Sequence, residues 1–463
     1  MASQAVSQLA LSLTDAYQAA LPKSKALYEQ AQKIFPSGVT HDGRYMTPFP
    51  IYVKRAKGSR KWDEDDREYV DYWVGHGALI LGHGHPVVLK AVQEQLEKGT
   101  HYGACHALEV EWGAQIIKMV PSAERVRFTS SGTEATLMAI RLSRAFSNKT
   151  RVVKFEGHFH GWHDNVAIGV NPPYEVPISP GLLDDVIGSV ILCPPNDTKA
   201  LENILREHHQ DIACVIIEPT GGSYGMIPTD PAFLPELRRL TAQYGVILIF
   251  DEVITGFRVA PGGAQEFYKI KPDLTTMAKI VAGGLPGGAV AGRKDIMEYL
   301  EFRKDDPHWN RHKKMYHPGT YNANPLSASA GLTTLRILES GEDIQKANTI
   351  AKALRDGMNE VIRKLGVDWY VYGDFSDFHF LIGIDPAQAS DPNFKVYNLD
   401  YHLLKGKANP DLIYKLRQGM ILNGVDIMRE GGMTSSAHTE EDVEITVKAF
   451  EATLRALQEE GSI

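Results

Sequence analysis

The sequence predicts an α/β protein, with a large domain around a mostly parallel β-sheet and a smaller α+β domain. The main observation is that short apolar runs alternate with amphipathic stretches from about residue 75 to 335, which is typical of parallel strands covered by helices on both faces. The apolar runs are 126–128, 152–155, 190–192, 214–217 and 246–250, and the clearest amphipathic stretches are 135–146 and 234–244. The second observation is length, because 463 residues exceed the roughly 300 that one hydrophobic core usually serves.

The chain before residue 75 is predicted to begin with a helix and to continue with short strands. Apolar residues recur loosely at helical spacing through residues 1–35, and Pro36-Ser37-Gly38 ends this pattern. The expected strands are 51–55 and 61–72, around turns that include Asp65-Asp66.

After about residue 336 the pattern changes to helices with a few strands, which is typical of an α+β domain. The expected helices are 344–365, 410–423 and 440–459, and the expected strands are 369–372 and 379–384. We therefore expect three parts: residues 1–74 pack with the smaller domain, residues 75–335 form the large domain, and residues 336–463 form the smaller one.

Composition and charge exclude several classes of function. The formal net charge of −8 disfavours nucleic acid and anionic membranes as partners. No run approaches the roughly 18 apolar residues of a membrane span, and the first twenty residues contain no Lys or Arg, unlike a signal or transit peptide. Three cysteines without a CxxC spacing favour a reduced compartment. We expect a soluble, cytoplasmic protein with no nucleic-acid or membrane partner.

The first candidate site follows the apolar run 126–128, where Ser131-Gly132-Thr133 leads into a predicted helix. A helix N-terminus presents unpaired N–H groups and the positive end of its dipole, so it can bind a phosphate. Gly132 lets the backbone approach closely, and Ser131 and Thr133 add hydroxyls. The same residues are also ordinary helix caps, so this motif alone does not identify a phosphate site.

The second candidate site is a pair of acids, Asp251 and Glu252, directly after the apolar run 246–250. Open α/β sheets bind ligands at the carboxyl ends of their strands. Asp251 could therefore bind a metal, a ribose hydroxyl or a protonated ring nitrogen, and the pair by itself does not choose among them.

The third candidate site is Lys279, which lies in the mostly apolar stretch 272–281. Burial lowers the pKa of a lysine, and the neutral amine can then form a Schiff base. A surface lysine at a strand end would look the same in isolation. A phosphate site, an acid and a Schiff-base lysine in this order are what pyridoxal 5'-phosphate (PLP) needs, since its ring nitrogen pairs with an acid and its aldehyde reacts with a lysine.

Four motifs of the chain resemble those of the class III aminotransferases, in the order and at the spacing of that family. They are Ser131-Gly-Thr-Glu-Ala135, Asp251-Glu-Val-Ile-Thr-Gly-Phe-Arg258, Pro272-Asp-Leu-Thr-Thr-Met-Ala-Lys279 and Gly319-Thr-Tyr-Asn-Ala-Asn-Pro325. The resemblance extends from about residue 30 to 450. It is closest to glutamate-1-semialdehyde 2,1-aminomutase and the β-amino-acid transaminases, and it implies a PLP-dependent transferase of fold type I.

The resemblance implies a role for each candidate site. Lys279 would form the Schiff base with PLP and move protons during the reaction. Asp251 would pair with the pyridinium nitrogen and keep it protonated. Ser131, Gly132 and Thr133 would bind the cofactor phosphate.

The resemblance also implies contacts that the residues alone do not predict. Thr320 would reach the phosphate from a second subunit, which requires a homodimer with its active site at the subunit interface. Phe159 stands where the family usually has a tyrosine that stacks on the cofactor ring, and a phenyl ring keeps the π-face needed for stacking. His160 and Glu218 match cofactor-binding positions of the family. Ser223 replaces an asparagine that the aminomutases place near the cofactor's phenolic oxygen.

A cluster of His158, His160, His163 and Asp164 has a different possible use. With the acids at 251–252 it could ligate zinc in a metallohydrolase. Its spacing matches no standard zinc motif, so we expect no metal.

Three residues are candidates for binding the substrate. Arg44 corresponds to an arginine that binds the substrate carboxylate in the aminomutases and β-amino-acid transaminases, and a guanidinium can hold a carboxylate through two hydrogen bonds. Glu430 matches a glutamate of the aminomutases. Arg429 does not belong to their pattern, and it could be a second carboxylate contact or a movable gate.

The expected function is therefore transfer of an amino group from an amino acid or amine to a keto acid. Departures from the aminomutase pattern at Phe159, Ser223, Arg429 and 321–323 favour this activity. The alternative is the aminomutase reaction itself, which moves the amino group within glutamate semialdehyde and is favoured by Glu430. A regulatory protein of the same fold, without activity, is a third reading, but the sequence has no appended DNA-binding region.

Overall fold

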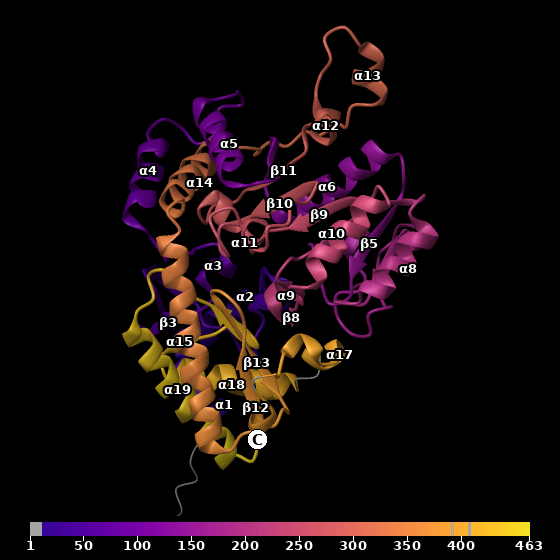
Figure 1. The fold of residues 1–463 in the computed structure, drawn as a ribbon. Coiled ribbons are helices and arrows are strands. Elements are labelled where there is room, and N and C mark those ends of the chain that lie inside the picture. The colour runs from indigo at the N-terminus through magenta and orange to yellow at the C-terminus, as the bar shows by residue number, and fades with distance from the viewer. Residues whose placement is uncertain (1–11, 390, 392, 406–408) are drawn as a thin grey trace, which may run out of the picture.

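The computed structural model describes residues 12–389, 391, 393–405 and 409–463, and its fold is shown in Figure 1. Its largest sheet has seven strands in the order β4-β11-β10-β9-β7-β5-β6. All of them run parallel except β11, which is antiparallel to both of its neighbours. The strands are β4 (Arg125–Thr129), β5 (Arg151–Phe155), β6 (Val190–Cys193), β7 (Ile212–Ile217), β9 (Ile247–Asp251), β10 (Leu274–Ala278) and β11 (Gly288–Gly292). The predicted mostly parallel sheet is confirmed.

Helices cover both faces of this sheet because its central strands are buried on both sides. The longer helices of this part are α4 (Pro86–Leu96), α5 (Ala107–Met119), α6 (Gly132–Ser147), α8 (Thr198–His208), α10 (Phe233–Gln243) and α14 (Pro325–Leu338), and the shorter ones are α3 (Val74–Gly77), α7 (Asp184–Ile187), α9 (Gly222–Gly225), α11 (Ala264–Tyr268), α12 (Lys294–Met297) and α13 (Pro307–His312). Ile216 and Ile249 pack in one core cluster with residues of α6. Their chain neighbours Val215 and Leu248 pack on the opposite face with residues of α8 and α10.

The carboxyl ends of the parallel strands bring the candidate residues to one edge of the sheet. Ser131 follows β4, Glu156 follows β5, Glu218 follows β7, Asp251 ends β9 and Lys279 follows β10. Residues separated by up to about 150 positions in the chain are therefore neighbours at this edge because of the strand order.

Two smaller sheets lie below the large one in Figure 1. One contains β1 (Val53–Lys57), β2 (Arg60–Asp63), β3 (Glu68–Asp71) and β14 (Val425–Asp426), and the other contains β12 (Trp369–Tyr372), β13 (Asp377–Ile382) and β15 (Gly431–Met433). Helices α15 (Glu342–Leu365), α18 (Pro410–Leu422) and α19 (Glu440–Glu459) pack around them, and the short α16 (Pro386–Ala389) and α17 (Tyr401–Leu404) lie between.

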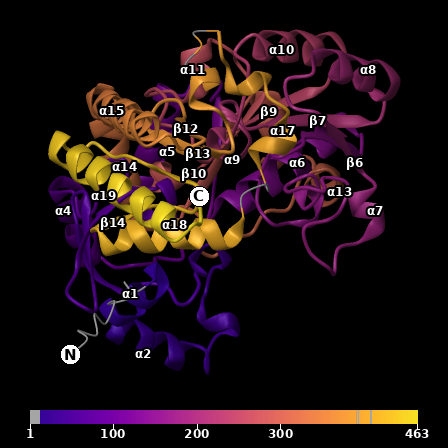
Figure 2. The same cartoon turned by 90° about the horizontal axis from the view of Figure 1, so that it is seen from below.

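The N-terminal segment packs against the C-terminal part of the chain. Strand β3 pairs with β14, and Tyr72 lies in one core cluster with Leu354 and Phe450. Figure 2 shows the N-terminal helices beside α18. These contacts agree with the expected packing of residues 1–74, and the domain boundaries at residues 74 and 335 stay a prediction.

Most predicted elements are present, one differs, and two strands of the large sheet were not predicted. The five apolar runs are strands, and the three C-terminal helices and two C-terminal strands are confirmed. The N-terminal helix is instead two, α1 (Leu13–Ala20) and α2 (Pro22–Ala31), because Pro22 cannot donate the hydrogen bond that would continue α1. Residues 1–11 of that prediction lie outside the described residues. Strands β10 and β11 were not among the predicted runs, since Thr275, Thr276 and several glycines interrupt their apolar pattern.

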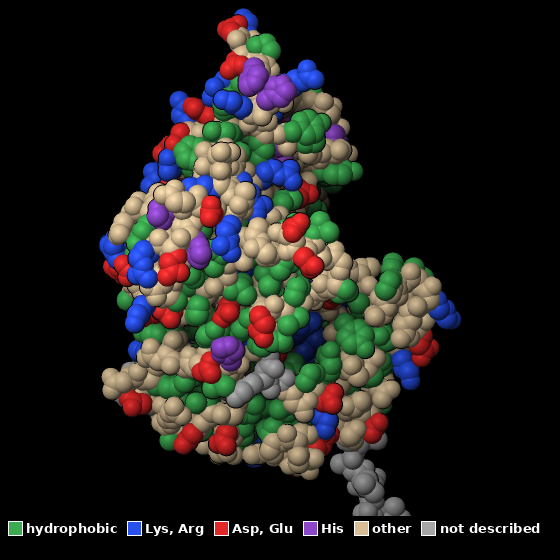
Figure 3. Space-filling view, turned by 90° about the vertical axis from the view of Figure 1, so that its right-hand side faces the viewer, with side chains coloured by type: hydrophobic (Ala, Val, Ile, Leu, Met, Phe, Trp, Pro, Cys, Tyr) green, Lys and Arg blue, Asp and Glu red, His purple; other side chains and the backbone are tan. Residues whose placement is uncertain are grey.

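The molecular surface mixes charges of both signs. On the face in Figure 3, Lys and Arg side chains are interspersed with Asp and Glu rather than gathered in one area. Among the described residues, no helix is both long enough and apolar enough to span a bilayer.

Candidate functional site

The start of α6 offers backbone donors for an anion. Ser131 is the N-cap, and its hydroxyl oxygen accepts the N–H of the third helical residue at 3.2 Å. The N–H groups of Gly132 and Thr133 make no hydrogen bond within the described residues. A Cβ on Gly132 would lie only 2.9 Å from Val253 and 3.4 Å from Ala278, so a side chain would push the helix start away from the ends of β9 and β10. This glycine thus keeps two free N–H groups close to Asp251 and Lys279.

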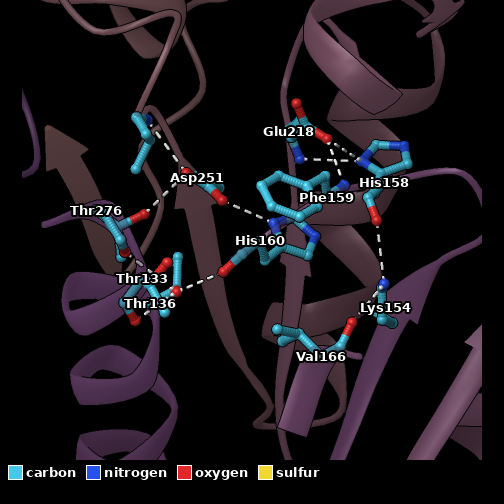
Figure 4. A network of polar contacts seen from close by, with 12 residues as sticks. Thr133, Thr136, Lys154, His158, Phe159, His160, Val166, Glu218, Asp251 and Thr276 are labelled. Carbon is cyan, nitrogen blue, oxygen red and sulfur yellow. Dashed lines mark hydrogen bonds and ion pairs between the residues drawn. The ribbon is translucent and has the colours of Figure 1, made fainter. Parts of the chain in front are cut away.

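Asp251 is buried, and both of its carboxylate oxygens are hydrogen-bonded. Oδ1 accepts from the Thr276 hydroxyl and the Val253 N–H, each at 3.1 Å, and Oδ2 lies 2.7 Å from Nδ1 of His160. His160 is held in turn by Thr136, whose hydroxyl lies 2.6 Å from the His160 carbonyl oxygen (Figure 4). The other ring nitrogen of His160 is buried and has no partner within the described residues. The carboxylate is therefore a fixed, oriented acceptor.

Lys279 begins a short 3-10 helix (Lys279–Ala282) directly after β10. Its φ of 53° is in the left-handed region, which is unfavourable for a residue with a side chain and is often found at functional sites. Burial lowers the pKa of the Lys279 amine, while the charges of Asp251 and Glu218 act in the opposite direction. Within the described part of the chain, this amine makes no hydrogen bond and no ion pair.

Two loops beside Asp251 are joined by Glu218. Its carboxylate accepts the N–H groups of Phe159 at 2.7 Å, Ser223 at 2.9 Å and Tyr224 at 3.0 Å. Burial raises the pKa of Glu218. The Phe159 backbone is thus fixed, yet the residue is 48% exposed, so its ring is accessible for stacking on a planar ligand. Figure 4 shows Phe159 beside His160 and Glu218.

The sequence reasoning missed two lysines here: Lys154 holds the chain that follows β5, and Lys405 holds both of these loops. Lys154 in β5 is fully buried and donates to three backbone carbonyls within residues 158–168, at 2.6 to 3.1 Å. Lys405 donates to the carbonyl of Gly157 at 3.0 Å and to the Ser223 hydroxyl at 2.7 Å. Burial lowers the pKa of Lys154 to about 7 and that of Lys405 to about 8. A lysine inside an apolar strand was a signal for Lys154, whereas no local pattern marks Lys405.

The structure brings Arg44 and Arg429 to the same turn. Arg44 is exposed and donates to the Thr40 hydroxyl at 2.9 Å, and Arg429 is exposed and lies 3.5 Å from the Asp42 carbonyl. Burial lowers the pKa of His41, and the charges of both arginines lower it further. Neither arginine forms an ion pair within the described residues.

His76 connects this turn electrostatically to Lys279, and it was also missed. Burial, followed by the charges of His41, Arg44 and Lys279, lowers the pKa of His76 to about 4. It lines a cavity of about 520 Å³ that Arg44 lines as well. Glu430 is partly buried, and burial raises its pKa against the opposing charge of Arg429.

Thr320 is exposed, and it forms no hydrogen bond with the start of α6 among the described residues. Its carbonyl oxygen lies 2.7 Å from Nε2 of His101, and it makes no hydrogen bond to Ser131, Gly132 or Thr133. Its expected contact with a phosphate stays a prediction.

The histidine cluster is not arranged around a metal position. Nδ1 of His158 accepts the Glu218 N–H at 3.1 Å, and Nε2 of His163 lies 3.2 Å from the Thr136 hydroxyl. Among the described residues, no group of three or more potential ligands is placed to bind a metal ion.

The remaining groups fit one kind of ligand. The free N–H groups of α6, the fixed acid Asp251, the exposed face of Phe159 and the unpartnered amine of Lys279 lie around one edge of the sheet. They suit a planar, cationic heteroaromatic ring that carries a phosphate and an electrophilic carbon.

Comparison with known proteins agrees with this donor set. The model of the family described as aminotransferase class-III matches residues 42–367. Glutamate-1-semialdehyde 2,1-aminomutase of Methanothrix thermoacetophila is 42% identical over 80% of this chain and 84% of its own. An omega-transaminase from Sphaerobacter thermophilus is 33% identical with a TM-score of 0.85, covering 94% of this chain and 98% of its own. A structure titled transaminase with PLP bound is 31% identical with a TM-score of 0.83, covering 96% of this chain and 99% of its own.

The match to the family covers most of the chain, and the fold is that of the fold type I transaminases. The expected resemblance, enzyme class and cofactor are thereby confirmed. This chain belongs to the class-III aminotransferases and is a PLP-dependent enzyme.

Proposed function

We propose that the protein is an aminotransferase that moves an amino group from an amino acid or amine to a keto acid, with PLP joined to Lys279. The observation that carries this proposal is which of three buried lysine amines near Glu218 make hydrogen bonds. Lys154 donates to three backbone carbonyls and Lys405 donates to two oxygens, whereas the Lys279 amine has no partner within the described residues. Only an amine with a free lone pair can attack an aldehyde.

The side chains around Lys279 suit the chemistry of this cofactor, which withdraws electrons from the substrate's α-carbon when bound. The neutral Nζ of Lys279 can accept a proton from that carbon and return it. Asp251, oriented by His160, would keep a ring nitrogen protonated. Gly132 and Thr133 would bind the phosphate through their N–H groups, and the exposed face of Phe159 would cover the ring.

The substrate class that the site favours is an acid. Arg44 and Arg429 are exposed, lie at the same turn and have no carboxylate partner within the described residues. A guanidinium binds a carboxylate strongly through paired hydrogen bonds, so this turn suits the carboxylate of a donor or acceptor. Arg429 lies on the exposed surface, which agrees with a gate that admits amines as well as acids.

The complete site is proposed to need two subunits. Thr320 makes no hydrogen bond to the start of α6 among the described residues, and its exposed position would let it contact a second copy. We also propose a cytoplasmic location, which the free state of Cys105, Cys193 and Cys214 supports.

The second candidate is the intramolecular aminomutase reaction. It is supported by the 42% identity to a relative of that name and by Glu430 beside Arg429. Conversion of glutamate 1-semialdehyde without an added acceptor would establish it.

The test is to record the visible absorbance of the PLP-loaded protein while single amino donors are added. The panel contains α-, β- and ω-amino acids and an arylalkyl amine. We expect the band of the Lys279-linked cofactor to bleach with a subset of donors and to return with a keto acid. The Lys279→Ala variant should slow this half-reaction by about 10²–10⁴-fold, the usual contribution of a proton-transfer group. Turnover of Lys279→Ala at the wild-type rate would contradict the proposal, and bleaching by no donor would favour the aminomutase.

A further inference from the structure

Two loops form one side of the site, and they are tied together from two directions. The first, residues 157–160, carries Phe159 and His160, and the second, residues 221–225, carries Ser223. From the sheet, Glu218 accepts N–H groups from both loops, as described above. From the opposite end of the chain, Lys405 donates to both loops as well, at 3.0 Å to a carbonyl of the first and at 2.7 Å to a hydroxyl of the second.

The second loop is strained and depends on such ties. Ser223 and Tyr224 have φ values of 53° and 54°, in the left-handed region that residues with side chains avoid. Conformations of this kind persist only where surrounding contacts over-determine them. The contacts here include the two N–H bonds to Glu218 and the bond from Lys405 to the Ser223 hydroxyl. The Ser223 hydroxyl also lies 3.4 Å from the Gly157 carbonyl of the first loop, and Nε2 of His379 lies 3.3 Å from the Tyr224 carbonyl.

Lys405 is carried to this position by a docked segment. The Tyr401 hydroxyl donates to the Glu156 carboxylate, and the rings of Tyr401 and Tyr174 lie 5.6 Å apart. The ammonium of Lys405 faces the charges of Glu218 and Glu430, and the charge of Lys154 acts on it from the sheet side. The segment 401–405 therefore contacts Glu156, Tyr174 and Gly157, and through Gly157 it reaches the first loop.

We propose that Lys405 is a positioning residue: it holds the loops 157–160 and 221–225 together, so that docking of the segment 401–405 restrains Phe159 and His160 in addition to their own bonds to Glu218 and Asp251. The inference rests on the proposed position of PLP against Phe159 and His160. It makes retention of the cofactor depend on a residue from the C-terminal part of the chain that does not itself touch the cofactor's reacting atoms.

The test compares Lys405→Met with Lys405→Arg and with Lys415→Met. Lys415 is a matched control, because it also donates two hydrogen bonds, to Glu460 and Ser462, at 2.9 Å each, within the C-terminal part. Two quantities are measured: the rate at which PLP leaves the holoenzyme, and backbone amide exchange in peptides that cover the two loops of the protein without PLP. We expect Lys405→Met to raise both by about tenfold or more, since charge-assisted hydrogen bonds are lost, and Lys405→Arg to restore most of the difference.

Three results would overturn the inference. They are wild-type release and exchange in Lys405→Met, equal changes in Lys405→Met and Lys415→Met, and no restoration by Lys405→Arg. If Lys405→Met does not fold, Ser223→Ala removes one of the two acceptors and should raise loop exchange to a smaller extent. Exchange without PLP tests the loop contact even if the proposed function fails, whereas failure of the wild-type protein to bind PLP would contradict the function and leave the exchange result standing.

Discussion

Lys279 differs from the nearby lysines Lys154 and Lys405 because its amine makes no hydrogen bond within the described residues. Lys154 and Lys405 have lowered pKa values for the same main reason, burial, but their amines are committed to carbonyl and hydroxyl oxygens. A lowered pKa therefore does not by itself mark a nucleophile in this site. The contact pattern and the lowered pKa of Lys279 together do.

The lowered pKa of Lys279 predicts how cofactor attachment depends on pH. The neutral amine reacts, and burial moves its pKa below the ordinary 10.5, so the reactive fraction grows at lower pH than for a free lysine. The rate of PLP attachment to the apoprotein should rise with pH and level off with a midpoint below 10.5. Stopped-flow absorbance measures it, with N-acetyl-lysine amide as the reference. A midpoint equal to that of the reference would contradict the account.

The sequence predicted those site residues that lie next to an apolar stretch along the chain. Ser131 and Asp251 follow apolar runs within a few positions, and Lys279 lies in a mostly apolar stretch, so local patterns were enough to single out these residues as candidates. Lys405 and His76 could not be found in this way. Their partners lie far away in the chain, and only the docking of separate elements brings them to the site.

At the scale of elements, a buried ion network joins the two ends of the chain. Lys61 in β2 lies 2.7 Å from Asp71 in β3 and 2.6 Å from Asp426 in β14, and all three side chains are nearly inaccessible. Burial alone would raise the pKa of Asp71, but the charge of Lys61 and the bond to His83 hold it well below its usual range. These strands are the contact between the N-terminal segment and the C-terminal part.

Replacing Lys61 by Met should lower the free energy of unfolding by about 3–5 kcal/mol, because two buried carboxylates would lose their cation. Denaturant titration measures this loss, with Lys352→Met, from an exposed pair, as the control. Because the pKa of Asp71 is lowered in the folded state, its stabilisation in the wild type should persist at neutral pH and fall as the pH drops below the usual carboxyl range. Equal effects of the two substitutions would show that the network does not stabilise the fold.

Helices and strands were predictable where the spacing of apolar residues was regular and turn residues or prolines marked the ends. The five apolar runs became strands of the large sheet. Strands β5, β7 and β9 are buried along almost their whole length, whereas β4 and β6, at the edges of the sheet, are only partly buried. Strand β11, Gly-Ala-Val-Ala-Gly, was missed since small residues give little hydrophobic signal, yet they are required where its Gly288 packs against the Ser131 and Met277 backbones. The break between α1 and α2 follows from Pro22, a signal that was present in the sequence.

At the scale of the whole molecule, the proposal of a shared site predicts complementation between subunits. In a heterodimer of Lys279→Ala and Thr320→Ala subunits, the site that keeps Lys279 would receive Thr320 from its partner. That site should bind PLP with wild-type affinity, whereas the Thr320→Ala homodimer should bind it more weakly. Differently tagged, co-expressed subunits and PLP titration measure this. Weak binding in the heterodimer would show that Thr320 acts within its own chain, and wild-type binding by the Thr320→Ala homodimer would show that Thr320 does not contribute to PLP binding.

The sequence pattern alone predicted that the N-terminal segment groups with the C-terminal part. The contacts that cause this grouping could not be predicted from it. The β3–β14 pairing and the Lys61 network connect residues separated by more than 350 positions, and no local pattern encodes such a contact. The strand order of the large sheet has the same origin, since β11 lies between β4 and β10 although it follows both in the chain.

The most direct test of the account is to find which lysine carries PLP. Borohydride reduction of the holoenzyme adds hydride to the carbon–nitrogen double bond between the cofactor and the protein, and peptide mass spectrometry then locates the stable pyridoxyl group. The account predicts the label on Lys279 alone, because the amines of Lys154 and Lys405 are occupied by hydrogen bonds. A label on either of those lysines, or no label on a protein that contains PLP, would contradict it.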